Sequence, residues 1–254
     1  MLKKRIIAVI LIKDNLVVQS ENFKHVNVIH SDTKIAIETF SGWSIDEIIL
    51  INVSNKNSEK KFLDLLNNIV KKVFVPITVG GWITDLDYAS ELFKSGADKI
   101  SINTEFYRNI NFAKSLSDKF GKQSIIASID YKFDKNTNIK SVHIDRGKES
   151  VNLDPLSWAL KLEPFVGEIF LTSIDHEGKR NGYDLEMIRK ISSNIKTPII
   201  TFGGVSNYEH LYQGFLAGAS AVAAANFFHY KEFSTILANK YLRNKNINLR
   251  KIYD

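Results

Sequence analysis

The sequence contains no cysteine and only four prolines and two methionines among its 254 residues. Without cysteine, the chain can form neither a disulfide framework nor a cysteine-based metal site. The six histidines lack the spacing of zinc ligands, so we predict no metal and no cofactor. The sequence also lacks 18 consecutive apolar residues, which argues against a membrane-spanning helix. We expect a cytoplasmic protein.

The sequence also lacks a linker, because no glycine- or serine-rich stretch interrupts it. We therefore predict a single domain over residues 1–254, with a large core drawn from the 44% of residues that are hydrophobic. The net charge of +6 fits either a lysine-rich solvated surface or an anionic ligand. The basic residues are scattered without interleaved aromatics, so we expect no nucleic-acid partner.

Segments of the first half of the chain recur in the second half, offset by about 120 residues. The pairs are IIAVI at 6–10 and IIASI at 125–129, PITVGG at 76–81 and PIITFGG at 198–204, and GADKISIN at 96–103 and GASAVAAA at 218–225. A half-chain repeat of strand and helix units predicts a closed barrel made of two half-barrels, about 1–120 and 121–254.

Short apolar runs alternate with segments of helical periodicity along the whole chain. The predicted strands are 5–12, 47–53, 75–80, 98–103, 124–130, 168–173, 198–202 and 221–225. The predicted helices are 32–43, 58–72, 85–95, 107–119, 154–163, 184–194, 207–217 and 229–242. This alternation predicts an α/β fold, a (β/α)8 TIM barrel with a two-fold half-barrel repeat. Two long connections, 13–31 and 131–152, follow equivalent strands at the predicted mouth and are either lids or small hairpins.

Small residues end the predicted seventh and eighth strands, where barrels of this type bind phosphate. Backbone N–H groups can approach an anion closely there, which favours a phosphate site at Gly203, Gly204, Ala225 and Asn226. The first half has a matching set in Gly81, Asn103 and Thr104. The two sites would suit a substrate with a phosphate at each end. Trp82, however, stands where the second half has Val205 and could crowd the first site.

Charged residues lie at both ends of the predicted barrel. Asp130 ends the fifth strand, where a carboxylate can transfer protons or simply bind a loop. Its counterpart in the first half is Leu11, which cannot transfer a proton. At the strand starts, four charged residues should meet around the barrel axis in a salt-bridge ring: Arg5, Glu47, Lys99 and Glu168.

Together these motifs resemble the cyclase subunit of imidazole glycerol phosphate synthase, the HisF family. The resemblance runs essentially from end to end and includes TVGG at 78–81, GADKISINT at 96–104, GEIFLTSID at 167–175, GYD at 182–184 and FLAGA at 215–219. It implies a (β/α)8 barrel whose N-terminal face binds a glutaminase (HisH-like) subunit. Ammonia would enter through the charged ring, follow the barrel axis and react at the mouth with a phosphate-bearing small molecule.

The resemblance assigns roles residue by residue. Arg5, Glu47, Lys99 and Glu168 match the ammonia gate, and Asp98 matches a position that faces the glutaminase. Thr78 and Ser101 match polar residues near the ammonia path, and Gly178 belongs to the second phosphate site, where Glu177 replaces an aspartate and Asn226 a serine. Asp130 matches one catalytic carboxylate. Leu11 stands where the other belongs, and the remaining departures from the family are Gln19 for a lysine, Asn52 for an aspartate and Trp82 for a glycine.

An intact partner face beside an altered reactive face suggests a divergent paralogue. In this hypothesis the chain supplies ammonia for acetamidino modification of a surface-glycan sugar, together with a sugar amidotransferase. Three alternatives stay open. The chain could be a genuine cyclase of histidine biosynthesis, a lyase with a rearranged acid/base pair. It could be a non-catalytic scaffold for the glutaminase, or the related isomerase, which also needs two opposed carboxylates.

Overall fold

The computed structural model describes residues 3–135 and 137–250 and shows a closed barrel of eight parallel strands. The barrel strands are β1 (Arg5–Lys13), β4 (Glu47–Asn52), β5 (Ile77–Gly80), β6 (Lys99–Ile102), β7 (Ile125–Asp134), β10 (Glu168–Ser173), β11 (Ile199–Phe202) and β12 (Ala221–Ala224). The ring closes where β12 pairs with β1, with Arg5 opposite Ala221 and Ala8 opposite Ala224. The predicted TIM barrel is confirmed.

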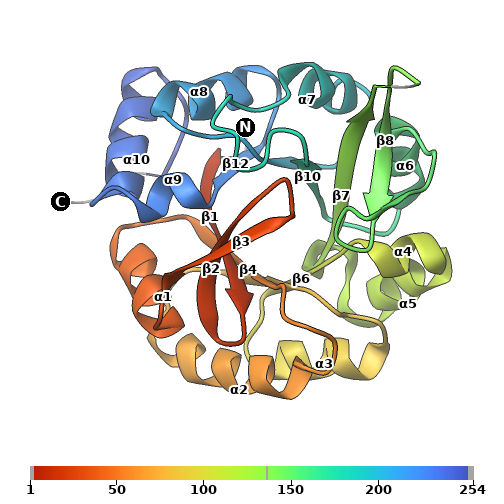
Figure 1. The fold of residues 1–254 in the computed structure, drawn as a ribbon, viewed down its shortest axis with the longest axis horizontal. Coiled ribbons are helices and arrows are strands. Elements are labelled where there is room, and N and C mark those ends of the chain that lie inside the picture. The colour runs from red at the N-terminus through yellow and green to blue at the C-terminus, as the bar shows by residue number, and fades with distance from the viewer. Residues whose placement is uncertain (1–2, 136, 251–254) are drawn as a thin grey trace.

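Helices surround the barrel on all sides, and Figure 1 looks along its axis. They are α1 (Thr33–Gly42), α2 (Glu59–Ile69), α3 (Leu86–Lys94), α4 (Thr104–Arg108), α5 (Ile110–Phe120), α6 (Pro155–Leu162), α7 (Leu185–Ser192), α8 (Tyr208–Leu216), α9 (Asn226–His229) and α10 (Ser234–Asn244). Side chains cap several of the N-termini: the Asp85 carboxylate accepts from the Tyr88 amide at 2.8 Å, and Asp154 accepts from Ser157 at 3.0 Å. These caps satisfy amides that the helices leave unpaired, so the chain turns into each of these capped helices at a defined residue.

Two helix predictions were wrong in detail. The predicted helix 107–119 is divided into α4 and α5, because Asn109 adopts an extended conformation with φ of −147°. The predicted helix 229–242 is instead the short α9 followed by α10, and Phe233 between them is left-handed with φ of 51°. One residue, Asn109, separates the first pair of helices, and residues 230–233 separate the second pair. The apolar pattern alone does not reveal either break.

Both long connections are β-hairpins built onto barrel strands. The first contains β2 (Leu16–Glu21) and β3 (His25–His30), with β2 antiparallel to the end of β1. The second contains β8 (Ile139–Ile144) and the two-residue β9 (Glu149–Ser150), with β8 antiparallel to the extension of β7. In Figure 1 the β2–β3 hairpin crosses the centre of the barrel, over the ends of the parallel strands.

The barrel interior consists of alternate side chains from the eight strands. An apolar cluster fills its middle: Ile7, Val9, Ile49, Ile126, Phe170, Ile200, Phe202, Ala221 and Ala223. A larger apolar layer lies between the strands and the helices. In the described part of the chain, no helix combines the length and apolar character needed to cross a membrane.

Candidate functional site

The N-terminal end of the barrel is closed by a ring of four charged side chains. The Arg5 guanidinium bonds Glu47 at 2.7 Å and also pairs with Glu168. The Lys99 ammonium completes the ring, at 3.2 Å from Glu47 and 2.7 Å from Glu168. Each carboxylate therefore has two cationic partners, which compensates the loss of hydration at this buried position.

Burial alone would raise the pKa of Glu168, but Arg5 and Lys99 outweigh it and hold that pKa below its usual value. Glu47 is 1% exposed and also accepts a hydrogen bond from the Thr78 hydroxyl at 2.7 Å. Thr78 is thus bound to the ring. Asp98 directly precedes the ring residue Lys99 at the start of β6 and is exposed. Its carboxylate accepts a hydrogen bond from the Ile77 amide at 2.8 Å.

Ser101 faces the barrel interior one layer above Lys99. Its hydroxyl is buried and has no hydrogen-bond partner among the residues that the structure describes. Native structures satisfy nearly all buried hydroxyl groups, so an unpaired one needs an explanation. The Ser101 hydroxyl offers a polar contact to a small polar molecule inside the barrel.

Asp130 lies at the opposite end of the barrel, at the mouth. Its carboxylate accepts from the Ser128 hydroxyl at 3.2 Å and from the Asn103 amide at 3.2 Å. Desolvation raises the pKa of Asp130 to about 7, against hydrogen bonds from Ser128 and Thr172 that lower it. A carboxyl group with this pKa can both donate and accept a proton near neutral pH.

The opposite side of the mouth has no carboxylate at the position of Leu11. Leu11 lies on β1, across the barrel from β7, and packs with Ile51 against the apolar interior cluster. Asn52 is buried and committed to its own loop, donating to the Ser58 hydroxyl at 2.9 Å and accepting from the Ser54 amide at 3.1 Å. The two flanks of the mouth therefore differ chemically.

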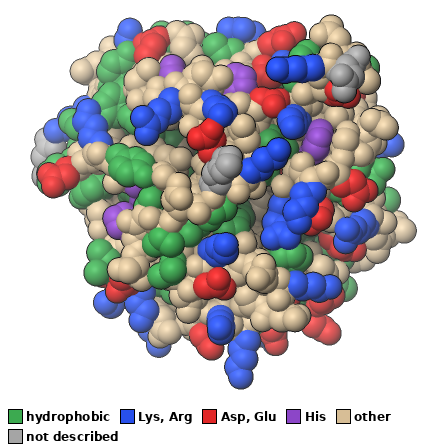
Figure 2. Space-filling view, viewed as in Figure 1, with side chains coloured by type: hydrophobic (Ala, Val, Ile, Leu, Met, Phe, Trp, Pro, Cys, Tyr) green, Lys and Arg blue, Asp and Glu red, His purple; other side chains and the backbone are tan. Residues whose placement is uncertain are grey.

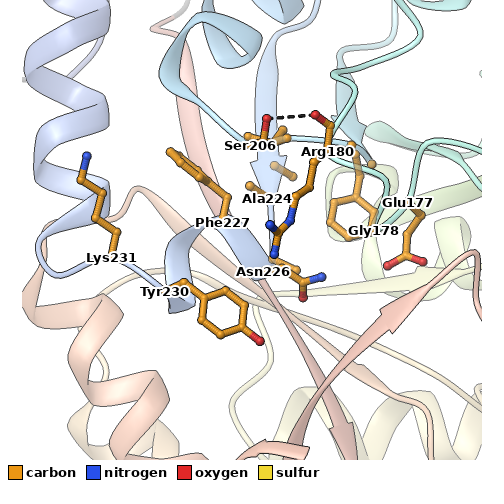
Figure 3. Close-up of a pocket in the computed structure, with 15 residues that line it drawn as sticks. Glu177, Gly178, Arg180, Ser206, Ala224, Asn226, Phe227, Tyr230 and Lys231 are labelled. Carbon is orange, nitrogen blue, oxygen red and sulfur yellow. Dashed lines mark hydrogen bonds between the residues drawn. The ribbon is translucent and has the colours of Figure 1, made fainter. Parts of the chain in front are cut away.

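A cavity of about 280 Å³ lies in the second half of the mouth. The predicted residues Gly178, Gly203, Gly204, Ala225 and Asn226 all line it. In Figure 3 the guanidinium of Arg180 points toward Asn226, whereas the Glu177 side chain lies apart from them. The cavity thus combines glycine backbone, an amide and a cation, which suits a phosphate group.

Glu177 holds the β2–β3 hairpin in place. It accepts from the Ser20 hydroxyl at 2.8 Å and from the Phe23 amide at 3.1 Å, and its burial raises its pKa. Gly178 packs against the same hairpin: a Cβ there would lie 2.8 Å from the Ser20 carbonyl oxygen. Gln19, on β2, accepts a hydrogen bond from the Tyr230 hydroxyl. The hairpin therefore contacts three residues that line the cavity: Glu177, Gly178 and Tyr230.

The Gly204→Ala variant is expected to lose about 1–3 kcal/mol of stability. Gly204 has φ of +93°, and a Cβ there would lie 2.2 Å from the Gly182 carbonyl oxygen. Chemical denaturation measures this loss, and phosphate titration measures the accompanying loss of affinity. The control is Gly42→Ala, since Gly42 in α1 has nothing within 4 Å of a built Cβ. Equal stability changes in the two variants would contradict this view of Gly204.

The first half of the mouth is arranged differently. Gly81 lies against the end of β4, and Trp82 follows it with φ of +58°. The Trp82 indole donates to the Ser54 carbonyl at 2.9 Å, and the Arg146 guanidinium lies 5.1 Å from its ring centre. Asn103 and Thr104 face this region but are hydrogen-bonded to the protein itself, as described below.

The fold and the two barrel ends define a duplicated (β/α)8 barrel with an ionic ring at one end and a polar cavity at the other. A family model described as histidine biosynthesis protein matches residues 5–234. The chain therefore belongs to the histidine biosynthesis protein family, and its relatives place it with the HisF subunits of imidazole glycerol phosphate synthase.

Three relatives illustrate the likeness. The hisF2 protein of Vibrio vulnificus (strain YJ016) is 38% identical over 253 residues, covering 98% of this chain and 92% of that protein. The HisF subunit of Prosthecochloris aestuarii is 37% identical over 253 residues, covering 98% of this chain and all of that protein. The HisF subunit of Pyrobaculum aerophilum is 34% identical over 240 residues, covering 94% of each chain.

Sequence reasoning missed Arg180 and Tyr230, which line the cavity. Arg180 belongs to the loop between Gly178 and Gly182, and the adjacent cations Lys179 and Arg180 between two glycines were the available signal. The structure separates the two cations, because Lys179 pairs with Glu21 of the hairpin while Arg180 lines the cavity. The sequence does not indicate which of the two faces the cavity.

Proposed function

We propose that this chain is the ammonia-accepting barrel of a two-component glutamine-dependent enzyme. A glutaminase binds the N-terminal face, where Asp98 lies exposed beside the ionic ring. Ammonia passes the ring of Arg5, Glu47, Lys99 and Glu168 and meets the Ser101 hydroxyl inside the barrel. It then reacts with a phosphate-bearing acceptor held in the cavity of the second half, beside Asp130.

One observation carries the proposal: a complete ring at one end coexists with an incomplete acid/base pair at the other. The ring holds two buried carboxylates and both cations in direct contact. The ionic arrangement costs desolvation energy, so an apolar plug of similar volume would close the barrel at least as well. A polar, hydrogen-bonding gate is more useful than such a plug when ammonia must pass.

The mouth favours ammonia transfer to an acceptor other than that of the cyclase. Imidazole formation in the family uses two opposed carboxylates, whereas this mouth has Asp130 opposite Leu11. We propose that the acceptor is a surface-glycan sugar that undergoes acetamidino modification, with a sugar amidotransferase as a third component. The nitrogen of ammonia replaces the oxygen of a sugar acetamido group, and that oxygen leaves as water after activation by the third component. Asp130 then serves as the single proton-transfer group.

The second candidate is the histidine-pathway cyclase itself, a lyase that forms imidazole glycerol phosphate. The names of the relatives favour it, since the similar proteins from Prosthecochloris aestuarii and Pyrobaculum aerophilum are imidazole glycerol phosphate synthase subunits. The pKa of about 7 at Asp130 also suits its chemistry. In this case water or another group would replace the carboxylate missing at Leu11.

Complementation of a histidine auxotroph that lacks the cyclase subunit distinguishes the two candidates. We expect no growth with this chain, because loss of one acid/base group lowers such rates by about 10²–10⁴-fold. The Leu11→Asp variant tests whether the missing carboxylate is the cause of the lost growth. Leu11→Asn is the matched control, because asparagine has the size of aspartate but no carboxylate. Growth with the unaltered chain at the rate of the native cyclase would establish the histidine-pathway function instead.

A further inference from the structure

The two halves of the mouth have unequal room for an anion. In the second half Gly203 and Gly204 are followed by Val205, and all three line the open cavity. In the first half Gly80 and Gly81 are followed by Trp82. An indole therefore occupies the place where the repeat supplies an isopropyl group.

Trp82 is held firmly in this position. Its φ of +58° lies in the left-handed region, which costs a bulky residue of order 1 kcal/mol or more. The indole N–H donates to the Ser54 carbonyl at 2.9 Å, and the Arg146 guanidinium covers the ring at 5.1 Å from its centre. These two contacts offset the strain and join the loop after β5 to the β8–β9 turn.

The side chains expected to bind a phosphate in this half are already engaged. The Asn103 amide nitrogen donates to the Ser128 carbonyl at 3.2 Å, the Asp130 carboxylate at 3.2 Å and the His143 carbonyl at 3.3 Å. The Thr104 hydroxyl donates to Asn103 at 3.2 Å and accepts the Asp145 amide at 3.0 Å. A ligand phosphate would have to break these bonds before either side chain could bind it.

The Asp130 carboxyl group also occupies part of this half of the mouth, where it bonds directly to Asn103. Asp145 reaches Thr104 only through its backbone amide, and its carboxylate lies near Lys148, at 3.8 Å. Arg146 lies over Trp82 and near the Asp145 carboxylate, at 3.9 Å. A phosphate in this half would lie beside the Asp130 carboxyl group, whereas in the second half it meets Arg180 and glycine backbone.

We propose that the acceptor of this barrel is a phosphomonoester: its single phosphate occupies the Gly203–Gly204–Asn226 cavity, and its other end is uncharged and lies against Trp82. The reaction that the acceptor undergoes rests on the proposed function. The number of phosphates that the acceptor carries does not depend on it. Trp82 is then a specificity-determining residue, since its indole, packed beneath Arg146, fills the space that an anion subsite would need.

Titration with inorganic phosphate tests the number of sites. We expect one phosphate per chain, with affinity reduced about tenfold in Arg180→Gln, because one charge-assisted hydrogen bond is lost. The matched control is Lys179→Gln, whose side chain pairs with Glu21 outside the cavity and should leave the affinity unchanged. Two phosphates per chain, or no phosphate binding, would overturn the proposal, as would an unchanged affinity in Arg180→Gln.

Linear alkanediol monophosphates and bisphosphates of matched length test whether the end of the acceptor near Trp82 is uncharged. We expect the two series to bind within threefold of each other at every length, since a second phosphate gains nothing at Trp82. Trp82→Gly should weaken the monophosphates without weakening inorganic phosphate. A bisphosphate that binds more than tenfold tighter than its monophosphate would overturn the inference. Failure of ammonia transfer in a separate assay would refute the proposed function and leave these results unaffected.

Discussion

Replacing Asp130 by asparagine is expected to lower the rate of glutamine-dependent amidation by about 10²–10⁴-fold. Asparagine preserves the size of the side chain but cannot exchange a proton at neutral pH. With Leu11 across the barrel, no second carboxylate at that position takes over the proton transfer. The measurement is the amidation rate of the barrel assembled with its glutaminase and, if required, the third protein. A rate within threefold of the unaltered enzyme would show that Asp130 is not the proton-transfer group.

The pH dependence of the same reaction provides a separate check. The rate should change around pH 7, the pKa of Asp130, and this inflection should disappear in Asp130→Asn. The matched control is Ser128→Ala, which removes a hydrogen bond that lowers this pKa and should move the inflection to higher pH. An inflection that stays in place in both variants would belong to another group.

Stability should depend on pH through the same residue, with a defined sign. The pKa of Asp130 is higher in the folded chain than in the unfolded chain, so the folded state binds this proton more tightly. The contribution of Asp130 to the free energy of unfolding is therefore complete below the pKa that this group has in the unfolded chain. It declines as pH rises toward 7, by at most roughly 1.4 kcal/mol per pH unit. Asp130→Asn should lack this decline.

Replacing Arg5 by methionine is expected to destabilise the barrel by about 3–5 kcal/mol, because Glu47 and Glu168 stay buried with one cation between them. Methionine keeps most of the volume, so the effect reports the charge. Thermal or chemical unfolding measures the loss. The surface pair of Lys72 and Glu38 provides the control, since Lys72→Met removes an exposed ion pair and should cost less than about 1 kcal/mol.

A second substitution tests whether the charge is the cause. Adding Glu168→Gln to Arg5→Met removes one uncompensated carboxylate and should recover part of the stability. The lowered pKa of Glu168 also fixes the sign of the pH effect. Its contribution is present above the unfolded pKa and is lost as pH falls through the lower folded pKa. Equal stability losses for Arg5→Met and Lys72→Met would contradict the ring's role in holding the barrel end together.

The barrel could be predicted because its signals are local and repeated. Each strand is a short apolar run such as residues 47–53, and the half-chain repeat checks one assignment against another. The breaks inside two predicted helices were missed, since one extended residue, Asn109, and the short segment 230–233 leave the apolar periodicity intact. The sequence did not decide whether the connections 13–31 and 131–152 are lids or hairpins, because their polar strands lack a clear alternation.

The site could be predicted where it depends on strand ends and not where it depends on loops. Asn226 and the glycine pair follow strands whose ends share one face of the barrel, so their proximity follows from the fold. The contacts of Arg146, Arg180 and Glu177 depend on how the β2–β3 and β8–β9 connections fold over the mouth. Those contacts join residues far apart in sequence, and no local pattern indicates them.

The pairing of β12 with β1 governs how the chain folds during synthesis. β1 is made long before its partner β12, which begins only at Ala221. Until then one side of β1 presents unpaired N–H and C=O groups, as an edge strand does. The slowest folding step is therefore expected to be this closure between β1 and β12, since distant pairings carry the largest loop-closure cost.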